Sequence, residues 1–157
     1  MSGSVASHLS APETAIQTVV ATAELTVDTT GIGFVDITRE AARFLDECRA
    51  ADGVLLLFLR HTSAALTIQE NADPDVQRDL VTALDRLAPA GAGWRHDTEG
   101  PDDMPAHVKT MLSGVSLHVP VAGGHMQLGT WQAIYLVEHR AQPHRRHVVL
   151  QFLGSGW

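Results

Sequence analysis

The stretch Gly53–Arg60, "GVLLLFLR", is a continuous apolar run with turn-forming residues on both sides. Asp52 stands before it, and His61-Thr62-Ser63 follows it. A short apolar run bounded in this way is typical of a β-strand that is covered on both faces. The stretch therefore predicts a strand inside the core of the domain.

Two elements are predicted ahead of this strand. Gln17–Val27, "QTVVATAELTV", is rich in β-branched residues that partly alternate, which indicates another strand. Thr38 can cap the N-terminus of a helix that ends at Asp52-Gly53. The apolar residues of this helix recur at helical spacing, at Ala41, Phe44, Leu45 and Cys48.

Strands and helices also follow the central run. Ala64–Ile68 can form a strand, and Asp73 as N-cap with Pro74 as first residue predicts a helix that runs to about Ala88. Pro105 predicts the start of a shorter helix through Leu112.

The C-terminal part contains three further runs that are alternating or apolar, "VSLHVPV", "HMQLGTWQAIYLVEH" and "HVVLQFL". Turns with glycine or proline separate them, so they read as antiparallel strands. The whole order of elements predicts an α+β fold, in which helices pack on one side of a mainly antiparallel sheet.

Length and composition limit the class of protein. The chain has 157 residues, and we expect a flexible tail over residues 1–16 and a single domain over residues 17–157. A net charge of −7 without a cluster of basic residues argues against nucleic acid as a partner. Cys48 is the only cysteine, and neither a secretory signal nor a membrane-spanning run is recognisable, so we expect a cytoplasmic protein that does not associate with membranes.

Polar residues gather where the predicted elements end, which is where a rigid scaffold presents functional side chains. Arg60–Ser63 can hold a phosphate and supply an acid, a base or a metal ligand, although a polar strand end would also explain them. Farther on, Asp73 is explained by helix capping, whereas Glu70 and Asn71 have no comparable structural duty. Glu70 and Asn71 are therefore the better functional candidates.

The stretch Glu99–His107, "EGPDDMPAH", concentrates acidic residues before a predicted helix. If Pro105 is the first helical residue, His107 is the third, where the helix dipole favours the neutral ring that binds a metal or accepts a proton. Asp103 then lies outside the helix. A structural alternative is that Asp102 and Asp103 only complement the positive end of that dipole.

The strand within "LGTWQAIYLVEHR" carries a fourth group of polar residues. Side chains alternate along a strand, so Thr130, Gln132 and Glu138 share one face, whereas His139 belongs to the other. Glu138 and His139 can enter one pocket only if the strand bulges or ends there.

Three long segments, in this order and spacing, resemble the YjbQ-like family of small bacterial and archaeal proteins. They are "HTSAALTIQENADPDVQRDL", "WRHDTEGPDDMPAHVKTML" and "LGTWQAIYLVEHR", and the likeness extends from about Thr18 to the C-terminus. The resemblance implies an α+β fold whose sheets pack around a threefold axis in a homotrimer. It also implies a secondary thiamine-phosphate synthase activity, which joins a pyrimidine diphosphate to a thiazole phosphate and releases pyrophosphate.

The matching polar positions supply the expected site of an enzyme for a small phosphorylated molecule. The expected catalytic residues are His61, Glu70, Asp103 and His107. The expected substrate-binding residues are Arg60, Thr62, Ser63, Asn71, Thr130, Gln132 and Glu138. A divalent metal is expected, and its candidate ligands are His96, Asp102, His107 and His139.

The identity of the metal and of the reaction stays open at this point. Carboxylates suit Mg²⁺, the usual partner of a diphosphate, whereas histidines suit Zn²⁺. This mismatch leaves two alternatives beside the synthase: a metal-assisted hydrolase of a phosphorylated small molecule, and a trimeric module that binds a metal or small ligand without turnover.

Overall fold

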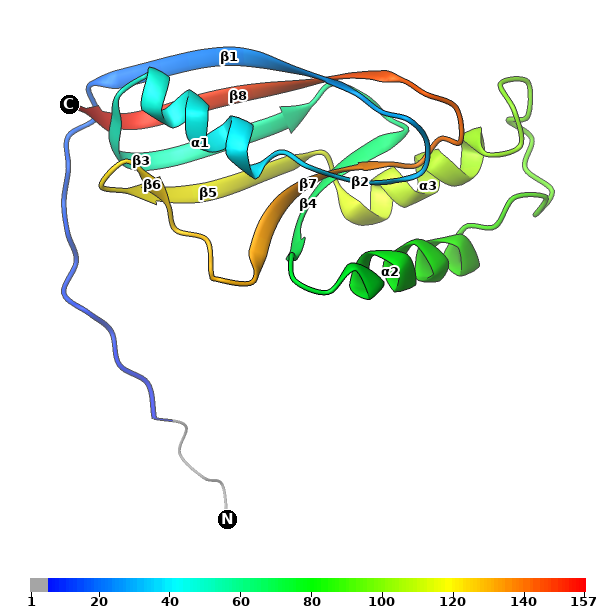
Figure 1. Cartoon of the computed structure of the whole chain (residues 1–157), viewed down its shortest axis with the longest axis horizontal. Coiled ribbons are helices and arrows are strands. Elements are labelled where there is room, and N and C mark those ends of the chain that lie inside the picture. Colours follow the sequence, from blue (N-terminus) through cyan, green and yellow to red (C-terminus); the bar gives the residue numbers. More distant parts are fainter. Residues whose placement is uncertain (1–5) are drawn as a thin grey trace.

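The computed structural model describes residues 6–157, which form three helices and eight strands (Figure 1). The helices are α1 (Thr38–Glu47), α2 (Pro74–Leu87) and α3 (Asp103–Ser113). The strands are β1 (Val19–Asp28), β2 (Gly33–Asp36), β3 (Ala50–Leu59), β4 (Ala64–Glu70), β5 (Ser116–Ala122), β6 (His125–Met126), β7 (Gln132–Glu138) and β8 (Arg145–Gly156). The α+β class is as predicted.

The strands form two antiparallel sheets, not the single main sheet that the sequence predicts. The larger sheet has the order β1-β8-β3-β5-β6, and the smaller has the order β2-β7-β4. The reason lies at β3, whose two edges are occupied by β8 and β5. Since β3 has no free edge, β4 cannot pair with it and pairs with β7 in the second sheet. The four-residue strand β2 is not among the elements that the sequence predicts.

The main core lies between the two sheets and is closed by α1. Leu55 and Leu57 of β3 belong to the same buried cluster as Leu66 of β4 and Leu136 of β7. The predicted helical stripe is confirmed for three members, since Ala41, Phe44 and Leu45 are buried, while Cys48 is only half-buried.

The prediction that the Gly53–Arg60 strand is covered on both faces is wrong within the single chain. Leu55, Leu57 and Leu59 are buried, but on the alternate face Phe58 is 51% exposed. Side chains of neighbouring residues point to opposite faces of a sheet. Helix α1 and the smaller sheet pack on the inner side, whereas α2 and α3 contact β2 and β4 of the smaller sheet. Within residues 6–157, no helix or strand covers the outer face of the larger sheet (Figure 1).

Helix α2 begins as the sequence predicts. The Asp73 side chain accepts a hydrogen bond from the backbone N–H of Asp75 at 2.9 Å, and Pro74 is the first helical residue. No side chain of α2 is fully buried. A buried lysine of α3, Lys109, forms an ion pair with Asp85 and so ties α2 to the domain.

The N-terminal segment before β1 has neither helix nor strand, and its first described residues lead away from the domain (Figure 1). The first five residues of the predicted tail lie outside the described part of the chain. Within residues 6–157, no helix is long and apolar enough to cross a membrane.

Helix α1 ends at Glu47, earlier than the predicted Asp52-Gly53 stop. The backbone of Arg49 is left-handed, with φ of 53°, and leads directly into β3. Gly53 therefore lies inside a strand, where a Cβ atom would stand 2.2 Å from the carbonyl oxygen of Leu153 in β8. Only glycine permits this approach of two backbones.

The close approach yields a prediction for Gly53→Ala. The added methyl group must push β3 and β8 apart, so we expect the free energy of unfolding to fall by about 1–3 kcal/mol, as for overpacking in a core. Urea denaturation would measure this. Ser116→Ala, an exposed substitution in β5, is the control, and equal midpoints for the two variants would contradict the prediction.

Candidate functional site

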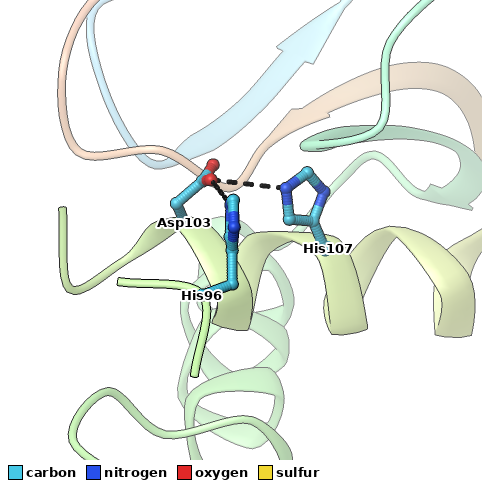
Figure 2. A group of neighbouring side chains, drawn as sticks. All are labelled: His96, Asp103 and His107. Carbon is cyan, nitrogen blue, oxygen red and sulfur yellow. Dashed lines mark hydrogen bonds and ion pairs between the residues drawn. The ribbon is translucent and has the colours of Figure 1, made fainter. Parts of the chain in front are cut away.

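Two histidines and one aspartate meet at the start of α3 (Figure 2). His96 Nε2 lies 2.6 Å from Asp103 Oδ2, and His107 Nε2 lies 3.3 Å from the same oxygen. The potential ligand atoms of the three residues all lie within 4.8 Å of one another. The cluster is therefore compact enough for one metal ion.

The start of α3 differs from the prediction, and the difference brings Asp103 and His107 together. Asp102 is the N-cap and Asp103 the first helical residue, so Pro105 is third and His107 fifth. The prediction that His107 is the third helical residue, where the helix dipole favours a neutral ring, is therefore wrong. Asp103 is inside the helix, and residues four apart in a helix lie on the same face.

Arg140, just beyond β7, holds the acidic segment in place. Its guanidinium donates to Asp103 Oδ1 at 2.6 Å, to Asp102 Oδ2 at 3.1 Å and to the carbonyl oxygen of Glu99 at 2.7 Å. Asp103 is only 1% exposed. Burial raises the pKa of its carboxyl, but the hydrogen bond from His96 and the charges of Arg140 and His107 lower it more, so the net pKa is below the ordinary value.

The hydrogen bond of His107 Nδ1 selects the tautomer of the neutral ring. Nδ1 lies 2.7 Å from the carbonyl oxygen of Thr62, which is only an acceptor, so Nδ1 carries the proton. In the neutral ring, Nε2 then presents a lone pair to the Asp103 carboxylate, which is also an acceptor. A cation between them, either a metal ion or a second proton on the ring, removes this repulsion.

The geometry and the donor set fit a transition metal. Two ligand atoms about 2.0–2.2 Å from one ion at a tetrahedral angle are about 3.4 Å apart, close to the 3.3 Å separation of His107 and Asp103. The 2.6 Å contact of His96 with Asp103 must open by several tenths of an ångström. Two imidazoles with one carboxylate are typical of zinc sites that keep an open position.

Two of the four residues predicted as metal ligands, His96 and His107, belong to this cluster, whereas Asp102 and His139 do not. Asp102 Oδ2 accepts from Arg140 and from the backbone N–H of Ala141. β7 ends at Glu138, so His139 lies just beyond the strand and the alternation argument does not apply to it. Burial is the main cause that lowers the pKa of His139 to about 4, and the positive charge of Lys109 adds to it.

Glu138 lies at the centre of a second polar group. It is 0% exposed, and Arg146 donates to both of its oxygens, at 2.8 and 2.6 Å. Thr29 donates to Oε1 at 2.7 Å, and the backbone N–H of Arg140 donates to Oε2 at 3.2 Å. Burial raises the pKa of Glu138, but these hydrogen bonds and the charge of Arg146 outweigh it, so the net pKa is lowered.

The turn after β3 links these groups. Arg146 also donates to the carbonyl oxygen and the hydroxyl of Ser63, while the neighbouring Thr62 accepts from His107. His61 accepts a hydrogen bond from the backbone N–H of His147 through Nε2 at 2.8 Å, and the two rings stack with centroids 5.8 Å apart.

Other predicted site residues do not join the cluster within one chain. Arg60 pairs with Glu24 at 3.1 Å. Glu70 pairs with Gln132 at one end of the smaller sheet, whereas Ala64 pairs with Glu138 at the other end. At about 3.3 Å per residue, the two ends are about 20 Å apart.

The residues at the far end satisfy one another locally. Glu70 accepts from the backbone N–H groups of Ala72 and Asp73, and Asn71 donates to the carbonyl oxygen of Thr130. Gln132 accepts from the backbone N–H of Gly129. These hydrogen bonds stabilise the turns at this end of the smaller sheet. They give a structural role to four predicted site residues: Glu70, Asn71, Thr130 and Gln132.

Arg140, Arg146 and Thr29 are not among the site residues that the sequence predicts. The signal in the sequence was that Arg140 and Arg146 both follow Glu138, at the polar end of a predicted strand. Alternation along this strand places Glu138 on the face that also carries Gln132. The partners of the two arginines, at Asp103 and Ser63, are remote in sequence.

The fold and the cluster together define a small α+β protein with two antiparallel sheets and a candidate metal centre at a helix start. The model of the family described as "UPF0047 protein YjbQ-like" matches residues 23–155. The chain belongs to this family.

Known relatives agree with this assignment in sequence and in fold. The UPF0047 protein YjbQ of Escherichia coli O157:H7 is 42% identical over 132 residues, which cover 83% of this chain and 96% of that protein. A hypothetical protein from Aeropyrum pernix K1 superposes with a TM-score of 0.79 at 32% identity, covering 86% of this chain and 99% of the other. A Clostridium acetobutylicum structure of the family gives a TM-score of 0.78 at 37% identity, with 83% and 98% covered.

The buried pair of Glu138 and Arg146 predicts a pH-dependent stability. Because the pKa of Glu138 is lowered in the folded protein, its contribution is present above the ordinary value of 4.5 and is lost as the pH falls through the lowered pKa. Glu138→Gln should lower the free energy of unfolding by about 3 kcal/mol at pH 7, and by less at pH 3. Urea denaturation of metal-free protein at both pH values would measure the difference.

The matched control is Asp28→Asn, which removes the carboxylate of the exposed pair with Arg145. Its denaturation midpoint should stay that of the unsubstituted protein at both pH values. A loss of stability in Glu138→Gln that is the same at pH 3 and pH 7 would contradict the assignment.

Proposed function

We propose that this YjbQ-like protein is a metal-dependent enzyme that acts on a small phosphorylated molecule, with His96, Asp103 and His107 as the metal ligands. The observation that carries the proposal is the convergence of two imidazoles and one carboxylate, whose potential ligand atoms all lie within 4.8 Å of one another. A metal ion between His107 Nε2 and the Asp103 carboxylate, which are 3.3 Å apart, would satisfy both groups.

The donor set favours Zn²⁺ or a similar transition metal over Mg²⁺. Magnesium prefers oxygen ligands in octahedral geometry, whereas imidazole suits zinc, copper, iron and nickel. A zinc ion held here would supply Lewis-acid chemistry to a phosphoryl oxygen.

The chain's own residues divide the remaining tasks. Asp103 is held in one orientation by Arg140, whose donors are engaged by three oxygens. The side chains of His96 and His107 are 44% and 31% exposed, so they form the open side of the centre, where a ligand can approach.

Two reactions fit such a centre. The family resemblance suggests thiamine-phosphate formation, in which the methylene carbon of the pyrimidine diphosphate bonds to the thiazole nitrogen while its C–O bond breaks and pyrophosphate leaves. Hydrolysis of a phosphorylated small molecule is the second candidate, and two histidines with one carboxylate favour it because hydrolytic zinc sites use this donor type. We propose a cytoplasmic location for either activity.

The proposal predicts that metal-free protein binds one Zn²⁺ per chain. His96→Ala and His107→Ala should each weaken binding at least about tenfold, since each removes a ligand. A zinc competition titration with a chromophoric chelator would measure this. His125→Ala, which removes an exposed histidine in β6, should leave the affinity unchanged.

Activity is tested on the same preparations. The zinc-loaded and magnesium-loaded proteins would be incubated with the pyrimidine diphosphate and thiazole phosphate for thiamine phosphate, and with each compound alone for released phosphate. Turnover that His107→Ala abolishes supports the enzyme. If the protein binds zinc but shows no turnover in any of these assays, the proposal that it is an enzyme is wrong, and the result favours a binding module.

The uncovered outer face of the larger sheet supports a homotrimer, which the family resemblance implies. Val54, Leu56 and Phe58 of β3 share this face with Val149 and Leu153 of β8. Phe58 is half exposed, although it is a large apolar side chain. Packing against further copies would remove this apolar surface from water.

The homotrimer predicts a clear effect of Phe58→Asp. A carboxylate on the outer face would be buried without a partner in the assembly, so the trimer should dissociate. Light scattering coupled to size exclusion would give the mass. Met111→Asp alters an 89% exposed residue of α3 and should leave the trimer intact. A single-chain mass for the unsubstituted protein would refute the homotrimer.

A further inference from the structure

Hydrogen bonds connect the two ligands Asp103 and His107 by separate routes that meet at one buried carboxylate. On the first route, Arg140 donates from its guanidinium to Asp103 Oδ1 at 2.6 Å and from its backbone N–H to Glu138 Oε2 at 3.2 Å. Arg140 therefore joins Asp103 to Glu138 through a single residue.

The second route passes through the turn after β3. His107 Nδ1 donates to the carbonyl oxygen of Thr62 at 2.7 Å, and the next residue, Ser63, accepts from Arg146 through its hydroxyl at 3.0 Å. Arg146 in turn donates to both oxygens of Glu138. Because Thr62 and Ser63 share a peptide plane, the hydrogen bonds that hold Ser63 also orient the acceptor of His107.

The connecting groups are shielded from water. Glu138 is 0% exposed, Arg146 3%, and Ser63 and Arg140 9% each. Water therefore cannot readily replace a lost partner, and removal of one charge leaves another buried without compensation. The hydrogen bonds also restrict motion, because each buried charged group contacts a group of opposite charge: Arg140 contacts Asp103, and Arg146 contacts Glu138.

We propose that Glu138 is a positioning residue for the metal centre, which sets Asp103 through Arg140 and His107 through Arg146 and the Thr62–Ser63 turn. This inference rests on the proposed metal function. It differs from the substrate-binding role that the sequence suggested for Glu138, because a side chain with no exposed surface does not touch a substrate. Outer groups that orient metal ligands commonly change metal affinity 10–100-fold.

The test is zinc affinity in Glu138→Gln, which keeps the shape of the side chain and removes its charge. We expect affinity to fall about 10–100-fold, measured by chelator competition at a temperature where circular dichroism shows the variant folded. The control is again Asp28→Asn, which alters the exposed ion pair with Arg145. This variant should bind zinc like the unsubstituted protein. Wild-type affinity in folded Glu138→Gln would overturn the proposal.

Two further variants separate the routes and cover the case in which Glu138→Gln does not fold. Ser63→Ala removes a hydroxyl from the second route, and Arg140→Lys replaces the fork of the first route. Nitrogen-15 NMR of the imidazoles in metal-free protein should show altered Nδ1–H exchange of His107 in Ser63→Ala and Glu138→Gln but not in Arg140→Lys. Both single-route variants should weaken zinc binding, and unchanged affinity in both would overturn the proposal.

Zinc binding by the unsubstituted protein and by Glu138→Gln separates the metal function from the role of Glu138. If the unsubstituted protein binds no zinc, the proposed metal function fails, and the inference about Glu138 as a positioning residue for a metal falls with it. If the unsubstituted protein binds zinc and Glu138→Gln binds it equally well, only the role of Glu138 fails.

Discussion

The ion pair between Arg140 and the acidic start of α3 is the interaction on which the candidate site depends. It joins the end of β7 to a connection, residues 88–102, that contains neither helix nor strand. Ordering such a segment costs about 1–2 kcal/mol of backbone entropy per residue, so it needs specific contacts. The guanidinium provides three of them at once and neutralises a carboxylate that is almost out of water. Without Arg140, nothing among the described contacts of Asp103 would balance its charge except the histidines.

The sequence predicts the structural features that neighbouring residues determine by themselves. Asp73 and Pro74 specify the start of α2 through a side-chain cap and a fixed backbone angle, and both act within three residues. The two-residue period of a strand likewise puts Leu136 and Tyr135 on opposite faces of β7, and the structure has Leu136 in the main core and Tyr135 in a smaller buried cluster with Ala65, Ala133 and Val137. Such patterns carry their own geometry.

The features that the sequence did not reveal depend on contacts between distant residues. Pro105 suggested a helix start, but the first helical N–H groups need no partner in the helix, so proline is also tolerated at the third position. Asp103 could therefore enter the helix, where Arg140 pairs with it. The division into two sheets has the same origin, because only the pairing of β3 with β5 and β8 leaves β4 to a second sheet.

The candidate site shows the same limit. The sequence predicts that polar residues at strand ends form one site, but β4 and β7 each have two ends, and the sequence does not say which ends lie together. The antiparallel register decides this by placing Ser63 and Glu138 at one end and Glu70 and Gln132 at the other.

The absence of fully buried side chains in α2, among the residues described, has a consequence for hydrogen exchange and partial unfolding. Elements that bury little surface open with a free energy below that of global unfolding. The backbone amides of α2 therefore have a route to exchange that leaves the main core folded. Such an opening would briefly wet the face of the smaller sheet that carries Tyr135 and Val137, a part of the protein that is closed in the fully folded state.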